Sequence, residues 1–186
     1  MSWKKKIKKY NIKKKEELLE KYPRYKNKLQ LGFFNGRETL LISQNPGNPL
    51  NGAPQKSVYG KKYEEMLRTT RMGKYIGRLI GLDWEGISVT NVVKIPTENN
   101  KTPDKKLVDI FGPITRGQIE ILQPKFIILL GAFARDWAAG EYGFKNKGFR
   151  YEQKKNGMLF MVVHHHAAWG KVKDADIDFV KEKLDS

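Results

Sequence analysis

The chain has 186 residues, of which 39% are hydrophobic, and these values favour a single folded domain over disorder. It contains no cysteine, which excludes disulfide bonds, thiolate zinc sites and cysteine-ligated clusters. The net charge of +16 favours a polyanionic partner such as nucleic acid, although a lysine-rich proteome would raise the charge in the same way. No apolar run reaches the roughly 20 residues of a membrane span, and the first residues lack the apolar core of a secretory signal. An intracellular protein (cytoplasm or nucleoid) without membrane contact is therefore expected.

Much of the positive charge lies at the N-terminus. Residues 1–28 carry 12 Lys and Arg against three Glu, which supplies +9 of the +16. A short helix is predicted near residues 16–22, and Pro23 ends it. We expect residues 1–30 to form a basic arm or helix that contacts phosphates without reading sequence, or otherwise a solvated and frayed helix. Residues 31–186 are expected to form one α/β domain.

Apolar segments predicted as strands alternate with predicted helices along the rest of the chain. The strands are expected at residues 38–43, 86–92, 125–130 and 158–163. The helices are expected at residues 61–80 with a break near 70–73, at 106–122, at 132–139 and from Asp174 onward. Pro113 predicts a kink or a break inside the second of these helices, and residues 140–157 favour neither structure. The alternation predicts an α/β three-layer sandwich around a central four-stranded parallel sheet.

Neutral polar residues follow the predicted strands, where ligands bind in open parallel sheets. The first strand runs into Ser43-Gln44-Asn45-Pro46-Gly47, the second into Asn91-Val92-Val93-Lys94, and the fourth into His164-His165-His166. Amide and imidazole groups suit a pocket that reads a neutral ring, whereas a Gly-rich phosphate loop followed by Lys-Ser or Lys-Thr is absent. Successive histidines on an extended chain point in opposite directions, so no metal site is expected.

The same segments resemble motifs of the uracil-DNA glycosylase superfamily. Residues 43–47 are closest to the Gly-Ile-Asn-Pro-Gly motif of the mismatch-specific branch, and Thr90-Asn91-Val92-Val93-Lys94 is similar to Thr-Asn-Ala-Val-Lys of the thermostable branch. Residues 119–132 resemble the helix and strand before the Leu-Gly turn of that branch, and His165-His166-Ala167-Ala168 resembles its final His-Pro-Ala-Ala motif. The resemblance covers residues 38–170. The cysteines that hold an iron–sulfur cluster in the thermostable branch are missing here, so a variant without a cofactor is expected.

The resemblance implies an enzyme that flips uracil, or a related deaminated base, out of DNA and hydrolyses its N-glycosidic bond. Asn45 would hold the attacking water and His165 would donate a hydrogen bond to O2 of the departing base. Asn91 would read the base through O4 and N3–H, with Gln44 and Gly47 in contact with it. Because an amide cannot take a proton at neutral pH, a modest rate is expected.

Some of these positions have a second interpretation. Asn45-Pro46-Gly47 is also an ordinary turn sequence, and Asn91 could cap the backbone at a strand end. His166 replaces the proline of the final motif, so His164 could occupy the catalytic position instead of His165. Otherwise His164 is expected beside the bound base.

Other residues are assigned by proximity to the motifs. Tyr59 would stack on the base or belong to the core. Trp169 would fill the gap that the flipped base leaves in DNA, or pack on a helix. Lys171 and Lys94 would contact DNA. Nothing in the sequence indicates that the Lys94 amine is desolvated as a Schiff-base lyase requires, so a monofunctional glycosylase is expected.

Two rival functions remain open from the sequence. A DNA-binding protein with weak or no catalysis could use the same fold, because Asn45 stands where other branches have a carboxylate. A nucleotide-binding enzyme of similar topology is the second. The base preference is also open among uracil, hypoxanthine and mismatched bases, and a monomer is expected.

Overall fold

The apolar segments predicted as strands form the centre of one sheet in the computed structural model of the chain. The structure describes residues 1–46, 71–81, 86–98, 101–145, 148–165 and 172–185. The central strands are β2 (Thr39–Ser43), β3 (Ile87–Asn91), β4 (Phe126–Leu130) and β6 (Met158–Val163). They pair in parallel in the order β3-β2-β4-β6. Every residue of β2 and β4 is buried, as expected for parallel strands covered on both faces. The predicted four-stranded parallel sheet is confirmed.

Two further strands, which the sequence did not predict, extend this sheet in antiparallel orientation. β1 (Phe33–Phe34) pairs with β3 and β5 (Tyr151–Lys155) pairs with β6, so the described residues form a six-stranded sheet. β1 has only two residues, and β5 is mostly polar, so neither carries the apolar alternation of a typical strand. The charges on β5 discourage pairing of this open edge with another chain.

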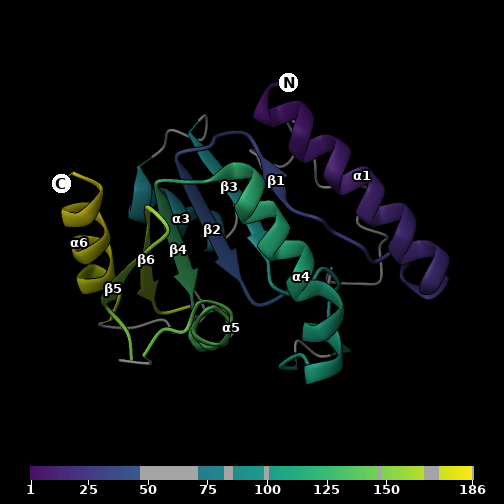
Figure 1. The fold of residues 1–186 in the computed structure, drawn as a ribbon. Helices are drawn as coiled ribbons and strands as arrows, with labels where there is room; N and C mark the ends of the chain where they lie inside the picture. Colours follow the sequence, from purple (N-terminus) through teal and green to yellow (C-terminus); the bar gives the residue numbers. More distant parts are fainter. Residues whose placement is uncertain (47–70, 82–85, 99–100, 146–147, 166–171, 186) are drawn as a thin grey trace.

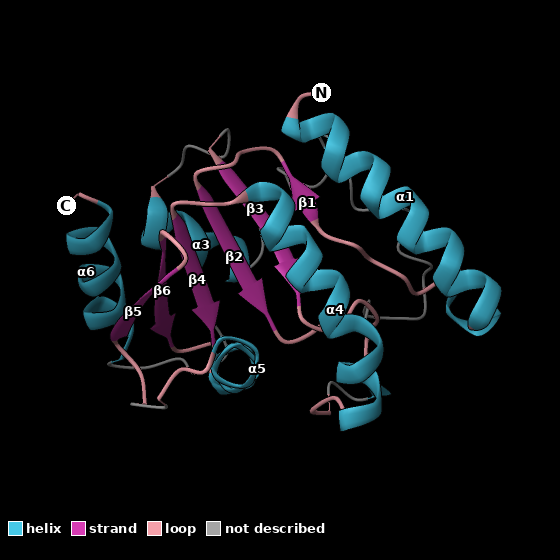
Figure 2. Cartoon of the chain, viewed as in Figure 1, coloured by secondary structure: helices cyan, strands magenta, loops and turns pink. Residues whose placement is uncertain are grey.

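Helices cover both faces of the sheet, which gives the predicted three-layer sandwich (Figure 1 and Figure 2). One face carries α1 (Trp3–Lys21), α4 (Lys105–Leu122) and α5 (Ala132–Tyr142). The other face carries α3 (Arg71–Ile80) and α6 (Val172–Leu184). Leu40 and Ile42 of β2 belong to the first core, whereas Leu41 between them belongs to the second. This alternation is the two-residue period of a strand. The predicted helix over 61–80 is described only from Arg71.

α1 is much longer than the short helix predicted near residues 16–22. Ser2 caps its N-terminus by accepting the N–H of Lys5 at 3.4 Å, and the run of good helix formers before Pro23 contains no residue that stops a helix. Ile7 and Leu18 are buried, and the Tyr10 hydroxyl donates to the Ile114 carbonyl oxygen of α4 at 3.3 Å. α1 is thus packed on the domain along its length, while the boundary after residue 30 stays a prediction.

Pro113 does not break α4. One helix runs from Lys105 to Leu122, and Asp104 caps it by accepting the Leu107 N–H at 2.9 Å. Pro113 lies on the exposed side, where the carbonyl that its ring leaves unpaired can bond to water. The predicted break is therefore wrong, and the alternative of a kink at Pro113 stays a prediction. None of the helices described above has the length and apolar character that crossing a membrane requires.

Candidate active site

The carboxyl ends of the parallel strands lie along one edge of the sheet (Figure 1). Ser43 of β2 pairs with Asn91 of β3, and Leu130 of β4 pairs with Val163 of β6, so the segments that follow leave the sheet side by side. The chain passes from β2 to β3 on one side and then returns to β4 on the other. The strand order therefore reverses between β2 and β4, and ligands bind at such a reversal in open α/β sheets.

Asn45, the predicted water-holding residue, has its side-chain amide fixed by three hydrogen bonds. Its Nδ2 donates to the Pro46 carbonyl oxygen at 3.0 Å and to Thr97 Oγ1 at 3.2 Å. Its Oδ1 accepts from Gln44 Nε2 at 2.8 Å. Both amide hydrogens are thus engaged, while Oδ1 keeps a second lone pair that a water molecule can use. Gln44, predicted to contact the base, directs its amide nitrogen to Asn45.

Asn91, the predicted base-reading residue, is the last residue of β3 and is partly exposed. The strand contact with the Gln44 segment continues beyond it, because the N–H groups of Val92 and Val93 donate to the carbonyl oxygens of Ser43 and Gln44 at 2.8 and 2.9 Å. The structure thus brings Asn45 and Asn91 onto adjacent segments of the same edge.

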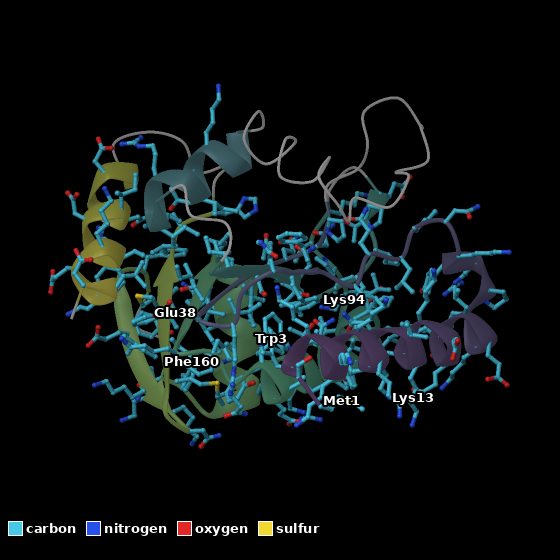
Figure 3. The ribbon with its side chains drawn as sticks, turned by 90° about the horizontal axis from the view of Figure 1, so that it is seen from above. Met1, Trp3, Lys13, Glu38, Lys94 and Phe160 are labelled. Carbon is cyan, nitrogen blue, oxygen red and sulfur yellow. The ribbon has the colours of Figure 1, made fainter. Side chains whose placement is uncertain are left out.

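Lys94 is fully buried, with 0% of its surface exposed. Its Nζ donates to Thr90 Oγ1 at 2.6 Å, to Gln118 Oε1 at 2.9 Å and to the Asn91 carbonyl oxygen. Figure 3 shows Lys94 in the interior beside α1, whereas Lys13 lies on the outer side of that helix. The prediction that Lys94 contacts DNA is therefore wrong, because its amine is enclosed by protein.

Burial also lowers the pKa of Lys94 well below its usual value. Nothing in the sequence indicated this desolvation, which we expected to be absent. A lowered amine pKa is one requirement of a Schiff-base lyase, but the amine must also reach the sugar. The Lys94 amine is directed at the end of β3 and at α4, so the geometry does not support lyase chemistry.

His165 packs against the residue that follows β4. A Cβ built on Gly131 would lie 2.9 Å from the Cβ of His165, and the Gly131 N–H donates to the Val163 carbonyl oxygen at 2.9 Å. His165 therefore lies at the β4 side of β6, toward the reversal of strand order. Burial lowers the pKa of its imidazole, so the ring is neutral at pH 7.

His164 is bound instead to α6. Its Nδ1 lies 3.1 Å from Oδ2 of Asp176, and its backbone N–H donates to the same oxygen at 3.0 Å. Its ring stacks on Phe149 with 3.8 Å between the ring centroids. The two neighbouring imidazoles thus have different surroundings, and His165 is the one in contact with the end of β4.

Four of the predicted site residues, Gly47, Tyr59, Trp169 and Lys171, lie outside the described residues. Two residues that the sequence interpretation missed belong to the site as described. Thr97 binds the Asn45 amide from the loop after β3, where no periodicity marks it. Asp176 is fully buried, and its position four residues before Val180 places a carboxylate on the apolar face of α6. A charge on an apolar helix face is a signal that the sequence did offer.

A groove of about 690 Å³ lies between α1 and α4. Its walls mix aromatic, basic and acidic side chains, among them Tyr10, Lys14 and Glu17, and include none of the predicted site residues. Within the described ranges, no three His, Asp or Glu side chains are grouped to hold a metal ion. Among the described residues, the strand edge is therefore the candidate site that the sequence predicted.

Comparison with known proteins gives one family. The model of the Uracil DNA glycosylase superfamily matches residues 32–183. The chain is 23% identical over 141 residues to a Type-4 uracil-DNA glycosylase of Sulfurisphaera tokodaii, with 70% of this chain and 60% of the relative aligned. The Type-4 uracil-DNA glycosylase of Archaeoglobus fulgidus is 29% identical, with 70% of this chain and 66% of the relative aligned. That of Saccharolobus solfataricus is 27% identical over 165 residues, with 80% and 72% aligned.

This chain thus spans less than two thirds of the length of the first two relatives. The family match itself begins just before β1 and ends within α6, so it includes the whole sheet and its carboxyl edge. The match covers most of the chain, and the described motif residues Asn45, Asn91 and His165 stand at the carboxyl ends of strands. The chain belongs to the uracil DNA glycosylase superfamily.

Proposed function

We propose that this chain hydrolyses the N-glycosidic bond of uracil, or of a related deaminated base, in DNA, as a monomeric enzyme of base excision repair. One observation carries the proposal: Asn45 follows β2, Asn91 ends β3 and His165 follows β6, so all three lie along one edge, beside the reversal of strand order. Membership of the superfamily and the relatives named Type-4 uracil-DNA glycosylase support it.

The proposed reaction needs no proton acceptor of high basicity. The base leaves the DNA stack and enters the pocket, where the Asn91 amide donates to O4 and accepts from N3–H. Cytosine presents the opposite pattern and is refused. The glycosidic bond breaks first, and the neutral His165 ring donates to O2 of the departing uracil anion. Water held by Asn45 Oδ1 then adds to the sugar cation and loses its proton to solvent.

Lys94 takes no part in this scheme as a nucleophile. Its Nζ is enclosed by Thr90, Asn91 and Gln118 and has no open direction toward a sugar. We therefore propose a monofunctional hydrolase, although the amine is desolvated.

A catalytically weak or inactive DNA-binding protein is the alternative function. The observation that favours it is the amide at Asn45, where the hydrogen bonds from Gln44 and to Thr97 leave no group able to take a proton. Within the proposed function, the preferred base is one of uracil, hypoxanthine or the mismatched base of a G·U or G·T pair, and the sequence does not select among them.

Release of free base from labelled oligonucleotides tests the proposal and separates it from the alternative. Wild-type protein should release uracil from at least one of single-stranded, U·A and G·U substrates. Asn91→Ala should lose this release while it retains affinity for the same DNA. Asn156→Gly, which changes an exposed asparagine of positive φ in the turn between β5 and β6, is the matched control and should behave as wild type. No release by the wild type from any substrate would favour the inactive DNA-binding protein.

A further inference from the structure

Lys94 has a buried amine, and the hydrogen-bond acceptors around it are neutral oxygens. Its Nζ donates to a hydroxyl of Thr90, to an amide oxygen of Gln118 and to the backbone carbonyl of Asn91. Transfer of an amine from water to the protein interior costs free energy unless it is well hydrogen-bonded, and an apolar side chain would fill this space without that cost. The contacts of the amine therefore need an explanation beyond packing.

Two of the donors in this region converge on one acceptor, the carbonyl oxygen of Asn91. Lys94 Nζ reaches it from the segment after β3, and Thr115 Oγ1 donates to it from α4 at 3.0 Å. Thr115 also lies 3.3 Å from the Val92 carbonyl oxygen. Asn91 ends its strand, where the sheet no longer fixes the backbone on both sides. The two donors supply that restraint.

Gln118 anchors the amine to the rest of the fold. Its Oε1 accepts from Lys94 Nζ and from Thr90 Oγ1, each at 2.9 Å. Its Nε2 donates to the Leu31 carbonyl oxygen at 2.6 Å and to Asn11 Oδ1 of α1 at 2.9 Å. The end of β3 is thus tied to α4 and to α1 by one buried network.

We propose that Lys94 and Thr115 are positioning residues, which hold the backbone of Asn91 so that its side-chain amide meets the flipped base in one orientation. This inference rests on the proposed function of Asn91. A shift of about 1 Å in a group that orients the substrate can lower a rate by about 100-fold. The network holds Asn91 through its main chain, so the side-chain amide of Asn91 stays available to bind the base.

The direct test compares Thr115→Val with Thr115→Ser. Valine keeps the shape and removes the donor, whereas serine keeps the hydroxyl. Single-turnover release of uracil should fall about 10- to 100-fold in Thr115→Val and stay within about twofold of wild type in Thr115→Ser. Lys94→Met should resemble Thr115→Val. Affinity for DNA with an abasic site should be unchanged in all three, because the fault lies in reading the base.

A control variant and a double-mutant cycle distinguish the proposed positioning role from a general loss of stability. Val180→Ala removes buried volume on the opposite face of the sheet, and it should lower the urea midpoint without the same fall in rate. In the Asn91→Ala background, where release is already lost, Thr115→Val should leave affinity for DNA with an abasic site unchanged and cause no further fall in any release that long incubation detects, since it acts through Asn91. Equal effects in both backgrounds, or a folded Thr115→Val with the wild-type rate, would overturn the proposal.

Failure of the proposed function itself gives a different result. In that case the wild type releases no base. NMR of the side-chain amide resonances of Asn91 then tests whether Thr115 positions that residue. These should move or broaden in Thr115→Val and not in Thr115→Ser. Unchanged resonances in Thr115→Val would overturn the inference independently of activity.

Discussion

The carboxylate of Asp176 binds His164 at both its backbone N–H and its imidazole Nδ1, at 3.0 and 3.1 Å. A carboxylate only accepts hydrogen bonds, so Nδ1 carries the proton and the tautomer of His164 is set. The Tyr75 hydroxyl lies 3.2 Å from the same carboxylate oxygen, and burial, together with the charge of Asp176, raises the pKa of Tyr75. A single residue of α6 thus fixes the backbone that enters His165.

Asp176→Ala should therefore weaken both stability and catalysis. Removal of the buried acceptor leaves the His164 N–H unpaired, and we expect a loss of about 2–3 kcal/mol in the free energy of unfolding. Base release should also fall, because His165 directly follows His164 in the chain and would no longer be held in place. Urea unfolding and single-turnover excision measure the two effects. Asp178→Ala, at an exposed position of the same helix, should change neither. An unchanged unfolding free energy in Asp176→Ala would contradict the assigned contacts.

Gly131→Ala should displace His165. Gly131 has φ = +90°, where a side chain is strained, and the added Cβ would lie 2.9 Å from the Cβ of His165. We expect a loss of about 1–3 kcal/mol from strain, with base release lowered at the same time. Gly140→Ala is the matched control on α5, because a Cβ there meets nothing within 4 Å. That variant should be neutral or slightly stabilising, as for alanine in a helix. Wild-type release by Gly131→Ala would place His165 outside the reaction.

The lowered pKa of His165 predicts a pH dependence of stability. Burial disfavours the imidazolium in the folded state, so the unfolded chain binds more protons between the folded pKa and the ordinary value of about 6.5. The contribution of His165 is complete above pH of about 6.5 and is lost as the pH falls through its folded pKa. The difference in unfolding free energy between wild type and His165→Gln should shrink as the pH falls from about 6.5 through the folded pKa of His165. A difference that is constant over this range would mean that the imidazole is not desolvated.

The basic N-terminal segment is proposed to contact DNA phosphates from the carboxyl edge. The N–H of Gln30 donates to the Lys94 carbonyl oxygen at 2.7 Å, which brings the residues before it close to the segment after β3. Neutralising Lys15, Lys26 and Lys28 to Gln should reduce the slope of log affinity against log salt by up to about 0.9 for each phosphate that the segment no longer neutralises. The same changes at Lys154, Lys155 and Lys181, which are exposed on β5 and α6, should leave the slope unchanged. Equal slopes for both triple variants would show that the segment is idle.

Substitution is a cleaner test of this segment than deletion. Ile7, Leu18 and Tyr25 are buried, and Leu18 and Tyr25 belong to the core cluster that contains Leu40 and Ile42 of β2. Removal of residues 1–28 would expose that cluster, so a weakened DNA affinity could reflect unfolding.

The parallel sheet could be predicted because its strands are continuous apolar runs, of which Phe126–Leu130 is the clearest. β5 could not, since Tyr151–Lys155 becomes a strand through pairing with β6 rather than through its own pattern. The length of α1 was underestimated for a related reason. Its lysines favour a helix, but the burial of Ile7 and Leu18 that stabilises it depends on α4.

The positions of Asn45, Asn91 and the histidines followed from strand ends, which sequence patterns locate well. Their partners did not follow. Lys94 was taken for a surface cation, because nothing local distinguishes a lysine that folds back into the core from one that faces solvent. Thr97 and Asp176 act across 52 and 12 residues of chain, and contacts of that kind are set by tertiary packing alone.

His165, which contacts Gly131 at the end of β4, comes late in the chain, and this order has a consequence for when the site forms during synthesis. Asn45 and Asn91, the groups proposed for water and base binding, lie at the ends of β2 and β3, which are synthesised early, whereas His165 comes after β6, the last of the described strands. β6 pairs with both β4 and β5, so its insertion also joins the outer strand to the sheet. Pairing across such sequence separations is slow compared with local helix formation. A nascent chain that ends before β6 would hold two thirds of the proposed catalytic groups and no competent site, so excision would begin only when the sheet is complete.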